Sequence, residues 1–442
     1  MSKLVTRAAA LHPHVAMRAL PAAVRALVSY DAASLWELDT AILPRALRRY
    51  RREVRAFAQE VLAPVALDLD RRHDEASVRT VMVEAGRRGL LTDLLPRPWG
   101  SAPWTRLVHP VTLVYSLKVE ELCAADAGLG LAIGAHALGQ MPVVLSGELS
   151  ALRRFLVPAY ARTRAGDPSL FAFAITEPAG GSDVEDTEGA AAYRPGTVAT
   201  RAAGGWRLNG RKVFISGGDH AAHVTVFAAL EGEGLESWTC FVVDRGMTGF
   251  TAVRNELKMG QCASSATELC FDDVFVPDDH VVGGLRRGWA LNRATLNTSR
   301  GPVGAIALGI ARGALEAALA FAGRARLGGK PLVEYQEVQL ALADMLVQTA
   351  AMRALVWQHG RRWTPRQAHA AMTKVFCSDQ AVRVCERAMD LLGNHGVVHG
   401  NRVEKAFRDA RLTQIYEGTN QINRLALIED QWSSLSRAAP EV

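Results

Sequence analysis

The sequence has few cysteines, and none of them forms a CxxC pair. The six lie scattered through 442 residues, at Cys123, Cys240, Cys262, Cys270, Cys377 and Cys385. Disulfide scaffolds and zinc sites depend on cysteines at short, regular spacings. We therefore expect reduced thiols, a reducing compartment and no metal site.

The sequence also lacks an uninterrupted apolar run of the length that spans a bilayer. Its most apolar stretch, residues 127–145, contains His136, Gln140 and Pro142. These residues favour a buried helix and turn over a membrane span. We expect no integral membrane segment.

Neither sign of charge dominates the chain. It has 51 basic and 45 acidic residues, interspersed, with a net charge of +6. This mild bias does not predict a nucleic-acid partner, although it suits an anionic substrate. The sequence also contains no internal repeat or low-complexity tract, and 49% hydrophobic with 22% charged residues is an ordinary globular composition.

Acidic residues are absent from the first thirty positions, which contain several arginines. That composition permits a mitochondrial transit peptide, but we favour an Ala/Arg-rich extension in a bacterial chain. We expect residues 1–36 to form an N-terminal extension. A bacterial cytoplasmic location is the first expectation, and the mitochondrial matrix is the alternative.

Hydrophobic periodicity divides the remaining chain into three zones. Residues 37–165 show helical spacing, as at Val54, Phe57 and Val61. Residues 166–284 show short alternating runs typical of strands, and Asn209-Gly210 predicts a hairpin turn. Residues 285–442 return to long helical patterns that suit a bundle.

Two motifs in the strand-rich zone have binding potential. In FAFAITEPAGGSD (residues 171–183), we expect a strand to end at Thr176 and a Pro/Gly turn to follow. Exposed N–H groups in such a turn can cradle an anion or a flavin, although a turn without a ligand is equally compatible. The second motif, LNGRKVFISGGDHAAHVTVFA (208–228), reads by itself as an ordinary hairpin strand.

Two further motifs make the pattern specific. They are KMGQCASSATELCFDDVFVPDDHVVGG (258–284) and LLGNHGVVHGNRVEKAFRDARLTQIYEGTNQINR (391–424). Taken in order, the four segments resemble the acyl-CoA dehydrogenases, and the RDAR–IYEGT–NQINR arrangement matches the family nearly residue for residue. The resemblance covers roughly residues 37–435.

The resemblance implies an α+β fold with an N-terminal α-helical domain, a middle β-barrel-like domain and a C-terminal four-helix bundle. It also implies FAD, an acyl-CoA substrate, α,β-desaturation, an electron-transferring flavoprotein as electron acceptor, and a homotetramer or homodimer. The alternatives are a dehydrogenase of acyl-carrier-protein thioesters and a non-catalytic scaffold of the same fold.

The resemblance assigns Glu417 as the catalytic base, with its own backbone N–H as a donor to the thioester carbonyl. By itself, an acid at the start of a helix would be idle and favoured by the helix dipole. Other family branches carry the base on an earlier helix, but that stretch holds Ser299 and no carboxylate nearby.

The remaining site residues are likewise implied by the resemblance. Those assigned to the cofactor are Phe173, Ile175, Thr176, Gly181, Ser182, Phe214, Ile215, Ser216, Gln336, Gly393, Thr419 and Gln421. Those assigned to the substrate are Ser182, Asn297, Arg300 and Gly418. For Arg300 a surface cation is the alternative.

Three departures from the family pattern concern the flavin. Ala325 and Gly328 stand where an arginine and a phenylalanine usually reach a neighbouring subunit's flavin, with Arg324 or Arg326 as possible substitutes. Asn394 replaces a common glycine, and Phe214 replaces the more usual tryptophan. We expect these departures to affect the adenine end of the flavin site and to leave the chemistry intact.

Overall fold

The computed structural model describes residues 20–27, 34–185 and 193–438. The chain divides into two compact units, residues 1–50 and 51–442. The first unit includes helices α3 (Ala22–Leu27) and α4 (Leu35–Ala41), and Ser34 and Glu37 cap the start of α4 reciprocally. Residues 1–19 and 28–33 of the predicted extension lie outside the described residues, so its targeting role stays a prediction.

Helices follow one another from residue 45 to residue 164, as the apolar spacing predicts. They are α5 (Arg45–Phe57), α6 (Ala66–Arg71), α7 (Glu75–Arg87), α8 (Trp104–Leu107), α9 (Val111–Ala125), α10 (Ala127–Leu145), α11 (Leu149–Ala151) and α12 (Val157–Arg164), with wider helical turns at Ala58–Leu62 and Leu152–Leu156. Asp126 separates α9 from α10, and its carboxylate accepts the Leu129 N–H at 2.7 Å. This cap satisfies a backbone donor where the second buried helix begins.

Among the residues that the structure describes, three helices are long and apolar enough to cross a membrane, judged by length and composition alone. They are α10, α14 (Gly288–Arg324) and α15 (Gln336–Gly360). Protein atoms bury 72%, 67% and 44% of their most apolar windows, respectively. A buried core helix and a membrane-spanning helix can have the same apolar composition. Helix α10 also continues through Pro142, without the turn predicted there. We interpret α10 and α14 as core helices.

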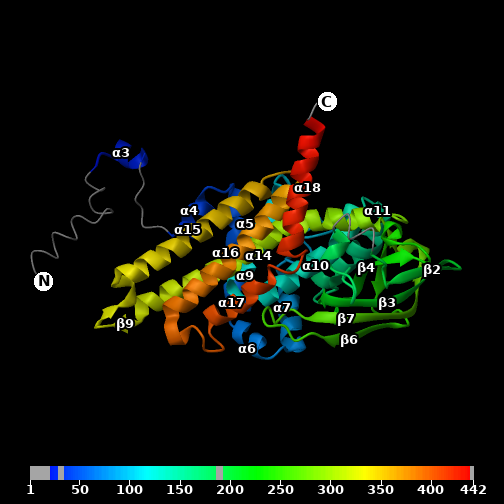
Figure 1. Cartoon of the computed structure of the whole chain (residues 1–442), viewed down its shortest axis with the longest axis horizontal. Helices are drawn as coiled ribbons and strands as arrows, with labels where there is room; N and C mark the ends of the chain where they lie inside the picture. The colour runs from blue at the N-terminus through cyan, green and yellow to red at the C-terminus, as the bar shows by residue number, and fades with distance from the viewer. Residues whose placement is uncertain (1–19, 28–33, 186–192, 439–442) are drawn as a thin grey trace, which may run out of the picture. The chain divides into compact units, whose positions relative to one another are not determined.

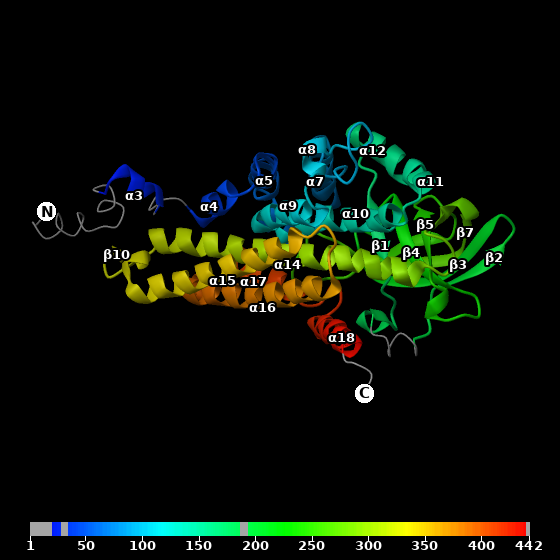
Figure 2. The same ribbon diagram turned by 90° about the horizontal axis from the view of Figure 1, so that it is seen from above.

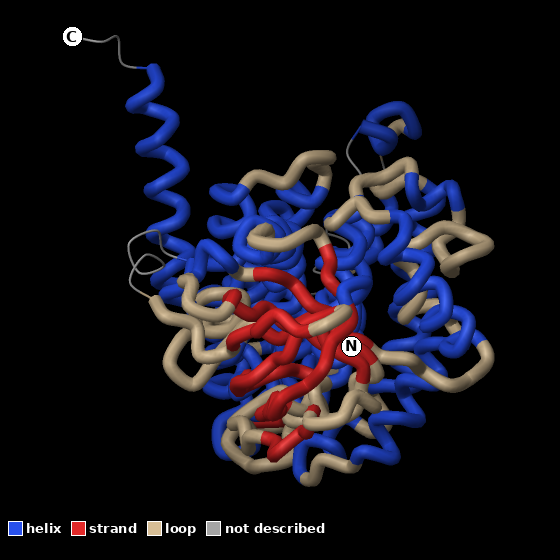
Figure 3. The backbone as a smooth tube through the Cα atoms, turned by 90° about the vertical axis from the view of Figure 1, so that its right-hand side faces the viewer, coloured by secondary structure: helices blue, strands red, loops and turns tan. Residues whose placement is uncertain are grey.

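Eight strands form one mixed sheet in the order β6-β7-β3-β2-β4-β5-β8, with β1 paired in parallel to β4. Figure 3 shows the strands gathered in one region, with helices around them. They are β1 (Phe171–Ala174), β2 (Val198–Ala202), β3 (Gly205–Ser216), β4 (His223–Leu230), β5 (Thr239–Asp244), β6 (Phe250–Asn255), β7 (Ala266–Pro277) and β8 (Val281–Val282). Strand β1 ends two residues before the predicted Thr176. Figure 1 shows α10 and α11 beside this sheet.

The predicted hairpin turn at Asn209-Gly210 is wrong. Both residues lie inside β3, where the register with β7 shifts, and the turn between β2 and β3 falls at Ala203-Gly204. Gly210 has φ +142°, and a Cβ there would lie 2.5 Å from the Thr197 Cα. The glycine permits a close backbone approach at a bulge. The sequence indicates only that a residue tolerates positive φ, and this property is common to bulges and turns.

The C-terminal part contains α14, α15, α16 (Gln367–Leu392), α17 (Arg402–Leu412) and α18 (Asn420–Ala438). A small hairpin, β9 (Arg326–Leu327) with β10 (Lys330–Pro331), joins α14 to α15. Figures 1 and 2 show α14, α15 and α16 side by side. Glycines on α14 permit this close packing: a Cβ at Gly304 would lie 2.8 Å from the Thr373 side chain. The α+β architecture is confirmed.

Replacing Gly210 with alanine should destabilise the protein by about 1–3 kcal/mol, because the new Cβ collides with backbone and the φ is unfavourable. Gly204→Asn is the matched control. Gly204 has φ +72°, and a Cβ there would meet nothing within 4 Å. Asparagine tolerates that conformation, so denaturant unfolding should show little change. Equal losses in both variants would contradict the bulge assignment.

Candidate active site

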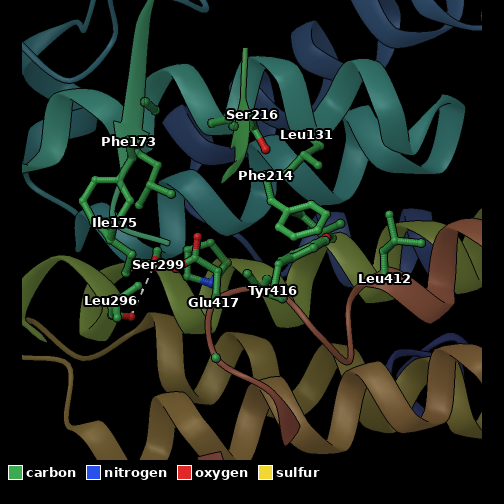
Figure 4. Close-up of a pocket in the computed structure, with 18 of the residues that line it drawn as sticks. Leu131, Phe173, Ile175, Phe214, Ser216, Leu296, Ser299, Leu412, Tyr416 and Glu417 are labelled. Carbon is green, nitrogen blue, oxygen red and sulfur yellow. Dashed lines mark hydrogen bonds between the residues drawn. The ribbon is translucent and has the colours of Figure 1, made fainter. Parts of the chain in front are cut away.

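A cavity of about 520 Å³ lies between α9, α10 and α14, the ends of β1 and β3, and the segment before α18. Most of its lining is apolar, with a few polar groups among the residues. The predicted site residues that line it are Phe173, Ile175, Thr176, Gly181, Ser182, Phe214, Ile215, Ser216, Glu417, Gly418 and Thr419. In Figure 4, Glu417 and Ser299 lie between Phe173 and Ile175 on one side and Phe214 and Tyr416 on the other.

Glu417 lies in a sharp turn between α17 and α18. Its φ is +56°, and Gly418 follows with a φ of +80°. Glycine adopts this left-handed conformation readily, but a glutamate rarely does, so neighbouring groups must hold it. The turn therefore has a defined geometry that depends on its surroundings.

Hydrogen bonds from two helices fix the turn. Lys374 Nζ on α16 donates to the Gly418 carbonyl at 2.7 Å and to Asn420 Oδ1 at 2.8 Å. Asn423 Nδ2 on α18 donates to the Gly418 and Thr419 carbonyls at 2.9 and 3.0 Å. The carbonyls of the turn thus face a buried set of donors.

The Glu417 carboxylate is half-buried at the cavity wall. Its Oε2 accepts a hydrogen bond from Ser299 Oγ at 2.6 Å. Burial raises the pKa of Glu417 above its ordinary value, although Ser299, Arg300 and Lys374 act in the opposite direction. A carboxylate with a raised pKa, facing a cavity, suits a general base.

The Pro/Gly turn of residues 176–182 lies directly against the Glu417 segment. The Thr419 N–H donates to Ser182 Oγ at 3.0 Å. Behind the turn, the buried Glu177 carboxylate accepts from Lys212 Nζ at 2.8 Å and from the Thr197 N–H at 3.0 Å. A buried acid with several donors holds this turn in one conformation.

The end of β3 turns an aromatic ring into the cavity. Phe214 has φ +59° at a register shift between β3 and β7, and the residue is 60% exposed, whereas Ile215 is 2% exposed. A strained backbone that exposes a phenylalanine is costly unless another surface covers the ring. Phe214, Ile215 and Ser216 thus offer an apolar face and a hydroxyl to a flat ligand.

Five predicted residues lie outside this cavity. Gln336, Gly393 and Gln421 are exposed at the starts or ends of helices. Asn297 and Arg300 line a separate, much smaller cavity. Arg300 is 3% exposed, and its Nε approaches the Glu417 carbonyl at 3.4 Å, so it is not a surface cation.

Models of known families match the chain along most of its length. The N-terminal, middle and C-terminal domains of acyl-CoA dehydrogenases match residues 45–163, 172–274 and 286–431, respectively. The chain belongs to the acyl-CoA dehydrogenase family.

Individual members of the acyl-CoA dehydrogenase family agree with this assignment. An acyl-CoA dehydrogenase of Bacillus subtilis is 33% identical over 85% of this chain and 95% of its own length. A short-chain-specific acyl-CoA dehydrogenase of Megasphaera elsdenii is 36% identical over 70% of this chain and 79% of its own length.

Solved structures of family members have the same fold. Butyryl-CoA dehydrogenase from Megasphaera elsdenii has a TM-score of 0.80 and 30% identity, over 88% of this chain and 99% of that chain. A chain solved in work on the electron transferring flavoprotein of Acidaminococcus fermentans has a TM-score of 0.79 and 30% identity, over 88% and 98%.

The sequence analysis did not predict the hydrogen-bonding roles of three residues around the Glu417–Gly418 turn: Lys374, Asn423 and Ser299. Lys374 had a readable signal, because it lies on the apolar stripe of α16 between Ala370 and Cys377, where a charge is unusual. Asn423 lies within the NQINR motif, but the motif does not show which groups it contacts. Ser299 had no such signal, since its partner is defined only by the folded turn.

The raised pKa of Glu417 predicts a pH-dependent stability difference from the Glu417→Gln variant. Ionisation of Glu417 is harder in the folded protein, so wild-type stability falls as pH rises through its unfolded pKa of 4.5 towards the higher folded value. Glutamine does not titrate. The variant should therefore gain stability relative to wild type at neutral pH, and the gain should vanish below about pH 4.

Urea unfolding of both proteins at several pH values measures this difference. A pH-independent difference, or one that grows towards acid, would contradict the raised pKa.

Proposed function

We propose that this chain is an FAD-dependent acyl-CoA dehydrogenase that desaturates a thioester between its α and β carbons, with Glu417 as the base. The observation that carries the proposal is the position of the Glu417 carboxylate. It lies at the wall of an otherwise mostly apolar cavity, close to the exposed face of Phe214 and the turn at Ser182. Membership of a flavin-dependent family supports the same conclusion.

The chemistry requires a proton to leave Cα and a hydride to leave Cβ. The Glu417 carboxylate takes the proton, and its own backbone N–H donates to the thioester carbonyl, where negative charge develops. Such a donor contributes on the order of 3 kcal/mol to transition-state stabilisation. Substrate binding displaces water and raises the pKa of the carboxylate further, so the base becomes stronger when it is needed.

The residues around the cavity fit a flavin. The volume of about 520 Å³ lies within the range of cofactor sites, and Phe214 offers its exposed ring as a packing surface. Phe173, Ile175, Phe214 and Ile215 would hold the ring system, and Thr176, Ser182, Ser216 and Thr419 supply polar groups around it. When bound, the flavin supplies the acceptor for the hydride that leaves Cβ.

Several exposed residues fit a second copy of this chain. Gln336 and Gly393, which the family resemblance assigns to the cofactor, lie at the protein surface and outside the cavity. Apolar Leu340 and Val347 are 61% and 67% exposed on α15. We propose a homodimer or homotetramer, in which such surfaces are covered and the adenine end of FAD meets a neighbouring subunit near Ala325 and Gly328.

The electron acceptor and the location are parts of the same proposal. An electron-transferring flavoprotein fits as acceptor, since a related chain was solved in work on such a protein. A role in fatty acid metabolism in a bacterial cytoplasm agrees with the bacterial origin of the relatives. The domain ranges 37–165, 166–284 and 285–442 are supported by the change from helices to strands after α12 and back at α14.

Glu417→Gln tests the role of the base. We expect the variant to retain yellow FAD but to lose at least about a hundredfold in turnover of acyl-CoA, the low end for loss of a general base. Turnover is measured with a panel of acyl-CoA substrates and an artificial electron acceptor, and FAD content by absorbance. Near-normal turnover would remove Glu417 from the mechanism, and a protein that stays colourless with added FAD would leave only the scaffold alternative.

The carrier of the acyl group is tested separately. Rates with free acyl-CoA and with the same acyl group on acyl-carrier protein are compared for the wild-type enzyme. We expect a clearly higher kcat/KM for acyl-CoA. A preference for the carrier protein would establish the alternative function without changing the chemistry at Glu417.

A further inference from the structure

A buried lysine lies beneath the turn that carries the proposed base. Lys374 is fully buried on α16, and its ammonium group contacts the Gly418 carbonyl and Asn420 Oδ1. Burying an ammonium group is unfavourable unless several acceptors surround it. Here those acceptors belong to the residues that directly follow Glu417.

The contacts of this lysine set the direction of the peptide groups in the turn. In a trans peptide, the carbonyl and the following N–H point in opposite directions. Lys374 and Asn423 hold the Gly418 carbonyl on the buried side, so the Thr419 N–H points the other way, where it meets Ser182 Oγ. Arg300 likewise approaches the Glu417 carbonyl, which turns the Gly418 N–H away from α14.

The same ammonium group affects the charge of the base. The charged groups that act on it are Arg300 on α14, Glu417 in the turn, Asp379 on its own helix and Arg424 on α18. Lys374 and Arg300 both lower the pKa of Glu417 against the effect of burial. Burial in turn lowers the pKa of Lys374 to about 7.

We propose that Lys374 is a positioning residue of the active site, which holds the left-handed Glu417–Gly418 turn and keeps the base ionised through its positive charge. The proposal rests on the assignment of Glu417 as the base. Lys374 need not contact the substrate for this role. It acts through its hydrogen bond to the backbone of the turn and through the electrostatic effect of its charge on Glu417.

Two substitutions separate the charge from the hydrogen bond. Lys374→Gln keeps a donor for the Gly418 carbonyl but removes the charge, whereas Lys374→Arg keeps the charge. The acidic limb of the pH profile of kcat/KM should move to higher pH by about one unit in the glutamine variant, since a nearby cation lowers a carboxylate pKa by at least that amount. Below this limb, kcat/KM should fall about tenfold. The arginine variant should keep the wild-type limb.

Lys405→Gln is the matched control. Lys405 is also buried, but it contacts Asp126 and Asp409 at 2.7 and 2.6 Å and does not line the cavity. Its substitution should lower the melting temperature without moving the acidic limb. A limb that stays in place in Lys374→Gln, or that moves equally in the control, would overturn the proposal.

A second measurement does not depend on turnover. Melting temperatures of the FAD-bound wild type, Lys374→Gln, Glu417→Gln and the double variant form a cycle, measured below the pKa of Lys374 so that its ammonium group is charged. The glutamine substitution at Lys374 should cost less when Glu417 is already glutamine, and additive effects would count against the coupling. If Lys374→Gln does not fold, the pH profile of Lys374→Arg tests the proposal instead. This variant retains the positive charge, so a displaced acidic limb of kcat/KM would contradict the proposal.

These outcomes differ from failure of the proposed function. If the wild-type protein does not oxidise acyl-CoA, the proposed reaction is wrong, whereas the melting-temperature cycle still tests the link between Lys374 and Glu417. If Glu417→Gln is inactive and Lys374→Gln has the wild-type profile, only the role of Lys374 is wrong.

Discussion

The active site depends on one constraint: a carboxylate must be removed from water far enough to become basic, and still face an open cavity. Burial raises the pKa of Glu417, but it also makes the ionised form unfavourable. The protein meets both demands by placing the residue in a left-handed turn between two helices, with cavity on one side and buried donors on the other. The geometry of that turn then determines what the surrounding helices must supply.

Three helices converge on this turn, and their packing explains why they are so closely spaced. Helix α14 contributes Ser299 and Arg300, α16 contributes Lys374, and α18 contributes Asn423. Small residues on α14 bring α14 and α16 together, since a side chain at Gly304 would collide with Thr373. A looser bundle would move the donors away from the turn. The close packing of the helices therefore also determines the geometry of the site in this part of the chain.

Much of the fold was readable in the sequence because periodicity reports which faces are buried. The change from helical to alternating spacing locates the strand-rich zone, and the family motifs assign Glu417, Ser182 and Phe214 to one site, where the same cavity brings them together. Local signals failed where the cause was tertiary. Asn209-Gly210 predicted a turn, but the glycine serves a close approach to Thr197 from a distant part of the chain.

The site residues divide in the same way. The predicted residues that line the cavity fall within contiguous motifs, so the resemblance identified them together. Lys374 lies 43 positions before Glu417 and outside the four motifs that resemble the family. Only its place on an apolar helical stripe marks it, and that pattern shows that a charge is buried without showing which group it meets. Gln336 and Gly393 are a different case, because one copy of the chain does not contain the surface that would explain them.

The arrangement of the two cations also explains how the proposed base can be both buried and reactive. A direct ion pair with Lys374 would lower the pKa of the carboxylate strongly and restrict its motion. Lys374 instead contacts the Gly418 carbonyl, Arg300 approaches the Glu417 carbonyl, and the carboxylate itself accepts a hydrogen bond from the neutral Ser299 hydroxyl. The two cations thus lower the pKa of Glu417 and moderate the effect of burial without cancelling it. The carboxylate keeps a raised pKa and a free approach to the cavity, which is the combination that proton abstraction from a weakly acidic carbon requires.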